Sequence, residues 1–291
     1  MRRYLSSSLD RHTVGITAGI LSAACFGITG ALINRLADAI PATEITFARG
    51  VIGILIISFL VRHRLHTLIQ KNSASIWVRA VAGAVSILCF SWNLQHTDVG
   101  TANILFNLSL IFVLFTEYTS GKMNLSFRTV ACIILAMVGI GLYWYGNKVI
   151  MSGEVLALGL VGAIAATIAY TALNKASRKN DPWLIVWCVS LMSIPLSLLA
   201  KSGDWAIPSV SDSFMLVIIA IGILIAHYLL NLSFSRLSLP IATAIGPSGM
   251  VWSVLGVAVF QGVMPPINAL LGTVVYVIGI GVLIAESKKQ A

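Results

Sequence analysis

Apolar residues gather in long uninterrupted runs along this chain, and short polar stretches separate the runs. A run of about 18–22 residues is long enough for a helix to cross a hydrocarbon layer about 30 Å thick. Ten such runs predict ten transmembrane helices, over residues 13–34, 43–61, 75–95, 101–119, 127–145, 154–174, 182–200, 213–233, 240–260 and 266–285. The connections average fewer than about ten residues, so no soluble domain is expected.

The composition agrees with this pattern. Hydrophobic residues make up 58% of the chain and charged residues only 10%, whereas about a quarter of an average soluble domain is charged. We therefore expect an all-α integral membrane protein that has the lipid bilayer as a partner. Arg2, Arg3 and Arg11 precede the first run, as in a secretory signal peptide. That run is too long for such a peptide and lacks a small-residue cleavage site, so it is expected to stay as a helix.

The basic residues are distributed unevenly between the two sides of the predicted bundle. A net charge of +9 could indicate a nucleic-acid partner, but the charges are dispersed among short connections. With the N-terminus in the cytoplasm, 14 lysines and arginines lie on the cytoplasmic side and 3 on the other. This is the asymmetry of the positive-inside rule. It predicts that both termini are cytoplasmic. The dispersion of the charges argues against a nucleic-acid partner, and a bacterial inner (plasma) membrane is the expected location.

The two halves of the chain resemble each other weakly. A shift of 140 residues places "NR" at 34–35 on "NK" at 174–175, and further short matches keep the same register. Each half contains five predicted helices, and an odd number of crossings turns the second copy upside down in the membrane. We therefore predict two five-helix repeats, residues 1–147 and 148–291, as inverted repeats around a central cavity. This architecture is typical of transporters.

The sequence "AIGPSGMVW" at 244–252 interrupts the ninth predicted helix with a proline between two glycines. Such a break frees a backbone carbonyl, which must be covered by neighbouring helices or face a wet cavity. At the 140-residue shift, Pro247 falls on Asn107. Four residues earlier, and so on the same helix faces, Thr243 falls on Asn103. These four residues lie near the depth at which inverted repeats bind substrate, and we predict that they do so. The alternative is a packing kink.

Polar residues of two further helices complete the predicted substrate site. His227, Tyr228 and Asn231 lie on the eighth predicted helix, and Tyr170 lies on the sixth. An ionisable residue near mid-depth is a functional candidate, and histidine titrates near physiological pH. An alternative stays open for each of two residues. His227 could only donate a hydrogen bond between helices, and Tyr170 could serve packing alone. Gly27 and Gly30 of the first helix are expected to allow close helix approach.

Three charged residues fall inside or near the ends of predicted helices. Arg49 lies about two turns inside the second helix, where an unpaired charge is costly. It is expected to pair with Glu44 or to snorkel toward the interface, and the alternative is that it attracts an anionic substrate. Arg79 is expected to snorkel to the cytoplasmic interface. Glu117 is expected to be a solvated carboxylate near the inner mouth.

Two helix-end patterns and one short motif point to a family. They are "FARG" at 47–50 and the glycine-rich helix ends "VGIGL" at 138–142 and "IGIGVL" at 278–283. Together with two five-helix halves, they resemble the drug/metabolite transporter superfamily in its EamA-type branch. The resemblance implies alternating access and a small organic substrate such as an amino acid, S-adenosylmethionine, a nucleobase or a nucleotide-sugar. Many members carry Gly-Glu after the fourth and ninth helices, where this chain has Gly-Lys at 121–122 and Gly-Val at 262–263.

No enzyme class is supported by the sequence. The predicted helices contain no H-E-x-x-H, no G-x-S-x-G and no paired mid-membrane carboxylates. The five histidines are scattered over different depths, so no metal, other cofactor or catalytic residue is predicted. The predicted function is a secondary transporter for a small-molecule substrate. The sequence leaves the oligomeric state open and favours a monomer. A non-transporting receptor or assembly subunit is the alternative.

Overall fold

Eight helices in the described part of the chain are long and apolar enough to cross a membrane. The computed structural model describes residues 2–63, 74–121, 152–201, 203 and 205–262, and isolated positions within 131–142 and 264–282. The predicted helices over 127–145 and 266–285 lie largely outside the described residues. No strand occurs among the residues that are described, so the all-α prediction is confirmed there.

Most of the described helices follow the apolar runs closely, because a backbone in hydrocarbon must satisfy its hydrogen bonds internally. The first helix is longer than predicted, because it begins at Arg2 and not at residue 13. One predicted run is divided: residues 240–260 form two helices separated by a 3₁₀ turn. The elements are α1 (Arg2–Arg35), α2 (Ala42–Leu60), α4 (Ala74–His96), α5 (Val99–Thr119), α7 (Gly153–Ala176), α8 (Pro182–Leu199), α9 (Val210–Arg236), α10 (Leu239–Ile245), the 3₁₀ helix η1 (Gly246–Ser248) and α11 (Gly249–Gln261).

Polar residues just before the helices fix where several of them begin. Asp98 precedes α5, and its carboxylate accepts the backbone N–H of Thr101 at 3.0 Å. Ser152 caps α7 in the same way. Ser209 and Asp212 form a reciprocal capping box at the start of α9. Each cap satisfies N–H groups that have no partner within the helix and contributes about 0.5–2 kcal/mol.

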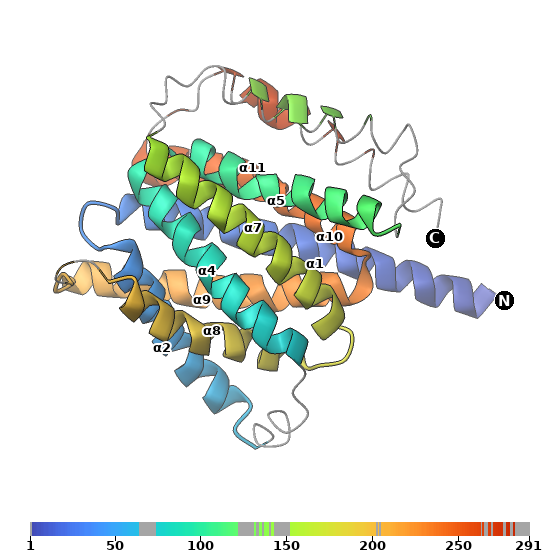
Figure 1. The fold of residues 1–291 in the computed structure, drawn as a ribbon, viewed down its shortest axis with the longest axis horizontal. Coiled ribbons are helices and arrows are strands. Elements are labelled where there is room, and N and C mark those ends of the chain that lie inside the picture. Colours follow the sequence, from blue (N-terminus) through green and yellow to red (C-terminus); the bar gives the residue numbers. More distant parts are fainter. Residues whose placement is uncertain are drawn as a thin grey trace.

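The helices pack side by side, and the two halves of the chain interleave (Figure 1). In this arrangement α1 contacts α9 and α11, while α4 contacts α7 and α8. The α2 helix contacts α8, and both α10 and α11 contact α5. The main apolar core joins residues from both halves, including Ile76 of α4, Leu173 of α7 and Phe234 of α9.

A hydrogen bond between helices recurs at the spacing of the sequence repeat. Nδ2 of Asn34 donates to the Leu94 carbonyl at 2.6 Å. At positions 140 residues later, Nδ2 of Asn174 donates to the Phe234 carbonyl at 3.5 Å. Each asparagine thus joins the end of one helix to the end of a helix 60 residues further on.

A second pair of bonds obeys the same shift. Oγ of Ser22 on α1 donates to the Ala226 carbonyl on α9 at 2.8 Å. Oγ of Ser86 on α4 donates to the Gly162 carbonyl on α7 at 2.9 Å. Positions 22 and 162 correspond, as do 86 and 226, so the α1–α9 and α4–α7 contacts are equivalent with donor and acceptor exchanged.

The break in "AIGPSGMVW" brings two helix backbones together. A Cβ atom on Gly249 would lie 2.9 Å from the Ala23 carbonyl oxygen of α1. A Cβ atom on Gly27, one turn further along α1, would overlap the Gly249 carbonyl oxygen. Neither glycine therefore has room for a side chain. The packing interpretation of the break is correct for Gly249, while Pro247 beside it faces a cavity.

Candidate functional site

A cavity of about 100 Å³ lies at the centre of the described bundle. Its wall is formed by residues of α1, α2, α4, α5, α7, α9, α10 and α11 and by the η1 break. Most of the wall is apolar, and a few polar side chains are distributed around it. This mixture is typical of a site for a small molecule, because the apolar surface supplies contact and the polar groups fix orientation.

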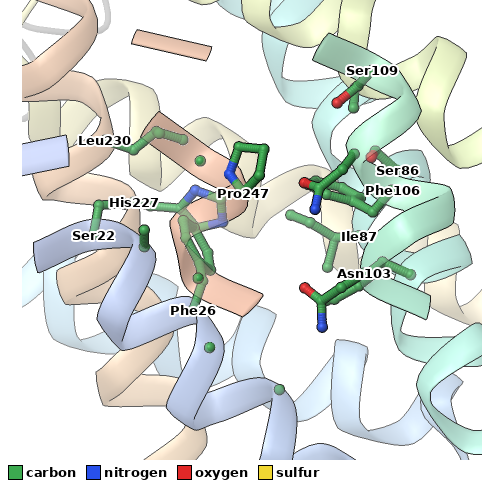
Figure 2. A pocket seen from close by; sticks show the side chains of 18 of the residues that line it. Ser22, Phe26, Ser86, Ile87, Asn103, Phe106, Ser109, His227, Leu230 and Pro247 are labelled. Carbon is green, nitrogen blue, oxygen red and sulfur yellow. The ribbon is translucent and has the colours of Figure 1, made fainter. Parts of the chain in front are cut away.

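Six of the eight predicted site residues line this cavity. Figure 2 shows His227 and Pro247 on one side of it, with Asn103 and Phe106 across from them. The α5 helix and the α10–η1 segment therefore meet at the cavity, as the repeat predicted. The six residues are Asn103, Asn107, Tyr170, His227, Thr243 and Pro247.

The other two predicted residues, Tyr228 and Asn231, are not among the described residues that line the cavity. The Tyr228 ring stacks on Trp183 with the ring centroids 4.5 Å apart. Nδ2 of Asn231 donates to the Pro182 carbonyl at 3.1 Å. Both side chains contact the start of α8.

The two α5 amides differ in how well the protein satisfies them. Nδ2 of Asn103 donates to the Val99 carbonyl at 2.7 Å and lies 3.4 Å from Oγ of Ser253. Nδ2 of Asn107 is buried and has no hydrogen-bond partner among the described residues. Because an unsatisfied buried donor costs about 1–3 kcal/mol, Asn107 gains more than Asn103 from a ligand that accepts a hydrogen bond.

Two arginines whose side chains were expected to pair or to reach an interface lie in the cavity wall. Arg49 is 6% exposed and Arg79 is 3% exposed, so neither snorkels to an interface. The expected pairing of Arg49 with Glu44 is replaced by other partners. Nη2 of Arg49 donates to Oγ of Ser193 at 3.0 Å, and Glu44 accepts the backbone N–H of Ala206 at 3.0 Å. Glu117 is half-buried and lies outside the described lining.

Gly83 makes room for the charged end of Arg79. The Arg79 side chain runs along α4 toward the C-terminal end of the helix, where a Cβ atom on Gly83 would overlap Nη1. This direction places Nη2 of Arg79 3.5 Å from Nδ1 of His227 on α9. Arginine can only donate, so Nδ1 accepts in this contact and Nε2 of His227 carries the ring hydrogen.

The positive charge of the cavity is not balanced by the described protein groups. No acidic side chain occurs among the described residues of the lining. Nε of Arg49, Nε of Arg79 and Nε2 of His227 are buried without a hydrogen-bond partner in the described part of the chain. A cation inside the membrane costs roughly 2.5–3.5 kcal/mol on insertion scales, and arginines at such depth commonly mark substrate or ion pathways.

Comparison with known proteins agrees with this architecture. Residues 13–145 match the family model described as the EamA-like transporter family. These residues belong to the EamA-like transporter family. The resemblance that the sequence motifs indicated is therefore confirmed, and the matched segment spans the first five predicted helices.

Similar proteins extend the similarity over the second half of the chain. The pseudopaline exporter CntI of Pseudomonas aeruginosa is 27% identical over 289 residues, which cover 97% of this chain and 99% of the relative. An uncharacterized transporter of Helicobacter pylori is 21% identical over 84% of this chain and 86% of its own. One crystal structure has a TM-score of 0.74 at 19% identity, and the match covers 97% of this chain and 98% of the other. The chain is thus an integral membrane protein whose relatives are transporters.

Proposed function

We propose that this protein is a secondary transporter that moves a small organic metabolite across the membrane by alternating access. The proposal rests on the central cavity, because helices from both halves of the chain form its wall. Repeat-built transporters hold their substrate at such an interface and open it to one side at a time. The similarity to a pseudopaline exporter favours export as the direction of transport.

The proposed rocking motion requires the two halves to be inverted repeats, and we propose ten helices in that arrangement. The bond from Asn34 to Leu94 and its counterpart from Asn174 to Phe234 support it, because both obey the 140-residue shift. The hydrogen bonds between α1 and α9 and between α4 and α7 support it independently, because the same shift relates one pair of bonded positions to the other. In the proposed arrangement, two helix pairs that pack alike in opposite orientations give the protein the two similar states that alternating access needs.

Substrate contact is proposed for the six predicted residues that line the cavity. Of the two amides, Asn107 is proposed as the main donor, because its Nδ2 has no partner among the described residues. Pro247 contributes differently, because the α10–η1 break leaves the helix hydrogen-bond ladder interrupted beside the cavity. Interrupted helices in transporters present backbone groups to the substrate. Tyr228 and Asn231 are proposed to hold α9 against α8 instead.

A binding screen followed by counterflow tests the transport proposal against its alternative. We expect at least one compound of a metabolite library to raise the melting temperature of the purified protein, because a ligand that binds the folded state stabilises it. The labelled form of that compound should then exchange into proteoliposomes preloaded with the unlabelled compound. Binding without exchange would favour a receptor, and chemical conversion of the compound would favour an enzyme.

The orientation is a second testable expectation, with cytoplasmic termini and the loops 35–43 and 200–212 outside. It rests on the distribution of 14 basic residues against 3. Ile207 is 98% exposed in the second of these loops, and Lys179 is exposed between α7 and α8. On a background without native cysteines, an impermeant maleimide added to intact cells should modify Ile207→Cys and spare Lys179→Cys. The opposite labelling would contradict the orientation.

A further inference from the structure

Arg49 and Arg79 are not required by the architecture of the bundle. They lie on α2 and α4, both in the first half of the chain. At the 140-residue shift their counterparts are Val189 and Ile219, which are buried apolar residues. The second half thus fills the equivalent positions without a charge. Two arginines in one half only are therefore better explained by the contents of the cavity than by packing.

The buried polar atoms around the cavity that have no hydrogen-bond partner among the described residues are all nitrogens that can donate. Nε of Arg49, Nε of Arg79 and Nδ2 of Asn107 are buried hydrogen-bond donors with no acceptor among the described residues. Nε2 of His227 is a fourth such donor when Nδ1 accepts from Arg79. Buried donors are normally satisfied. A ligand that satisfies all four must be rich in acceptors.

The charges select among acceptor-rich ligands. The guanidinium groups of Arg49 and Arg79 belong to the wall of the same cavity, and like charges repel each other there. The side chains that the structure places against them, Ser193 and His227, bring no negative charge. An anion bound between the arginines would remove the repulsion and supply acceptors to both Nε atoms. Guanidinium groups bind planar or tetrahedral oxyanions through paired hydrogen bonds.

The apolar part of the cavity wall limits the size of the ligand and favours one with a carbon skeleton. Phe26, Ile87, Phe106 and Leu230 surround the polar groups with apolar surface (Figure 2). A cavity of about 100 Å³ has room for a small molecule only. An inorganic ion would leave this apolar surface without contact, whereas a short carbon chain would cover it.

We propose that the substrate is a small organic dianion, whose negative groups pair with Arg49 and Arg79 and whose carbon skeleton lies against the apolar wall. This assignment rests on the proposed transport function and specifies its substrate class. Carboxylate and phosphate share the required oxyanion chemistry. Asn107 and His227 donate to the remaining oxygens. With the anion bound, the buried cations and donors all have partners.

The test measures thermal stabilisation of the purified full-length protein by glutarate, succinate and glycerol 3-phosphate. Glutaramide and glycerol, which are neutral counterparts, serve as ligand controls. We expect at least one of the anions to raise the melting temperature and the neutral compounds to leave it unchanged. Carboxylate and phosphate are distinguished by which of the anions acts. No shift with any of the three anions, or an equal shift with the neutral compounds, would overturn the proposal.

Three variants connect the shift to the two arginines. Arg49→Gln and Arg79→Gln should each lower the affinity for the active anion at least tenfold. Arg178→Gln, at an exposed arginine outside the described lining, should leave it unchanged. If a glutamine variant fails to fold, Arg49→Lys or Arg79→Lys keeps the charge but loses the paired donors, and weaker binding is expected from it too. Unchanged affinity in the folded variants would exclude the arginines from the site.

Gly83 offers a test that leaves both arginines in place. Outside its own helix backbone, the three atoms nearest to a Cβ built on Gly83 all belong to the Arg79 side chain. The methyl group of Gly83→Ala should therefore displace the Arg79 guanidinium while the rest of the packing is retained. We expect an unchanged melting temperature without ligand and a reduced shift with the anion. A reduced melting temperature with an undiminished shift would contradict this positioning role.

The outcomes separate substrate class from transport. Anion binding that depends on both arginines, without counterflow of the labelled anion, would support the dianion site and overturn the transporter. Counterflow of a neutral metabolite that is indifferent to both arginines would support the transporter and overturn the dianion site.

Discussion

Replacing Asn107 by alanine is expected to weaken ligand binding by roughly 1–3 kcal/mol, or about 5- to 150-fold in affinity, while the fold remains intact. Nδ2 of Asn107 is buried at the cavity and has no partner among the described residues. The protein therefore loses no internal hydrogen bond from Nδ2 when the amide is removed, whereas the complex loses a donor to the ligand. The dissociation constant of the compound found in the stabilisation screens is the quantity to measure.

Leu108→Ala is the matched control for this prediction. Leu108 follows Asn107 on α5, is turned about 100° around the helix, and is half-buried outside the described cavity lining. Its truncation should alter the dissociation constant little, although the melting temperature can fall because apolar contact is lost. Near-native binding by both variants would remove Asn107 from the substrate site.

The helices could be predicted because few backbone conformations are stable inside a membrane. Each backbone group in hydrocarbon must be satisfied within its own segment, so an apolar run of sufficient length becomes a helix. The run 182–200 corresponds to α8, which begins at Pro182 and ends at Leu199. The run 240–260 shows what periodicity leaves open. Its proline indicated a break in the helix. The close contact between Gly27 of α1 and Gly249 of α11 joins two helices, so it could not be predicted from the residue pattern of one of them.

The residues that line the cavity could be predicted where the side chain is short and where the 140-residue shift indicated which face of the helix it occupies. Asn103 and Asn107 extend only a little from α5, so their position on the helix determines what they contact. Arginine is different, because its long side chain reaches in either direction along a helix. Arg79 lies only about 7.5 Å from the start of α4, which favoured an interfacial position. Gly83, one turn further along, leaves the inward path open. A glycine four residues after an arginine is a feature that could have indicated this placement.

The close contact between α1 and α11 at the break should make the protein's stability sensitive to added volume there. Gly27→Ala should destabilise the protein, because its Cβ atom would overlap the Gly249 carbonyl oxygen. It would also lie 2.8 Å from Cβ of Trp252 and 2.9 Å from the backbone nitrogen of Ser253. Two of these three atoms belong to the backbone, so α11 as a whole must move away from α1. Overpacking of this kind costs about 1–3 kcal/mol and occasionally more.

Gly30→Ala provides the comparison on the same helix. The nearest atoms to a Cβ atom on Gly30 are Cδ1 of Leu94 at 3.8 Å and Oγ of Ser253 at 3.9 Å, which are ordinary contact distances. Alanine is favoured over glycine within a helix by about 1 kcal/mol, so this variant should melt at the wild-type temperature or above it. Thermal unfolding of the two purified variants under identical conditions measures the difference. Equal melting temperatures would show that α1 and α11 do not depend on the contact between Gly27 and Gly249, and that the glycines of "AIGPSGMVW" serve the cavity alone.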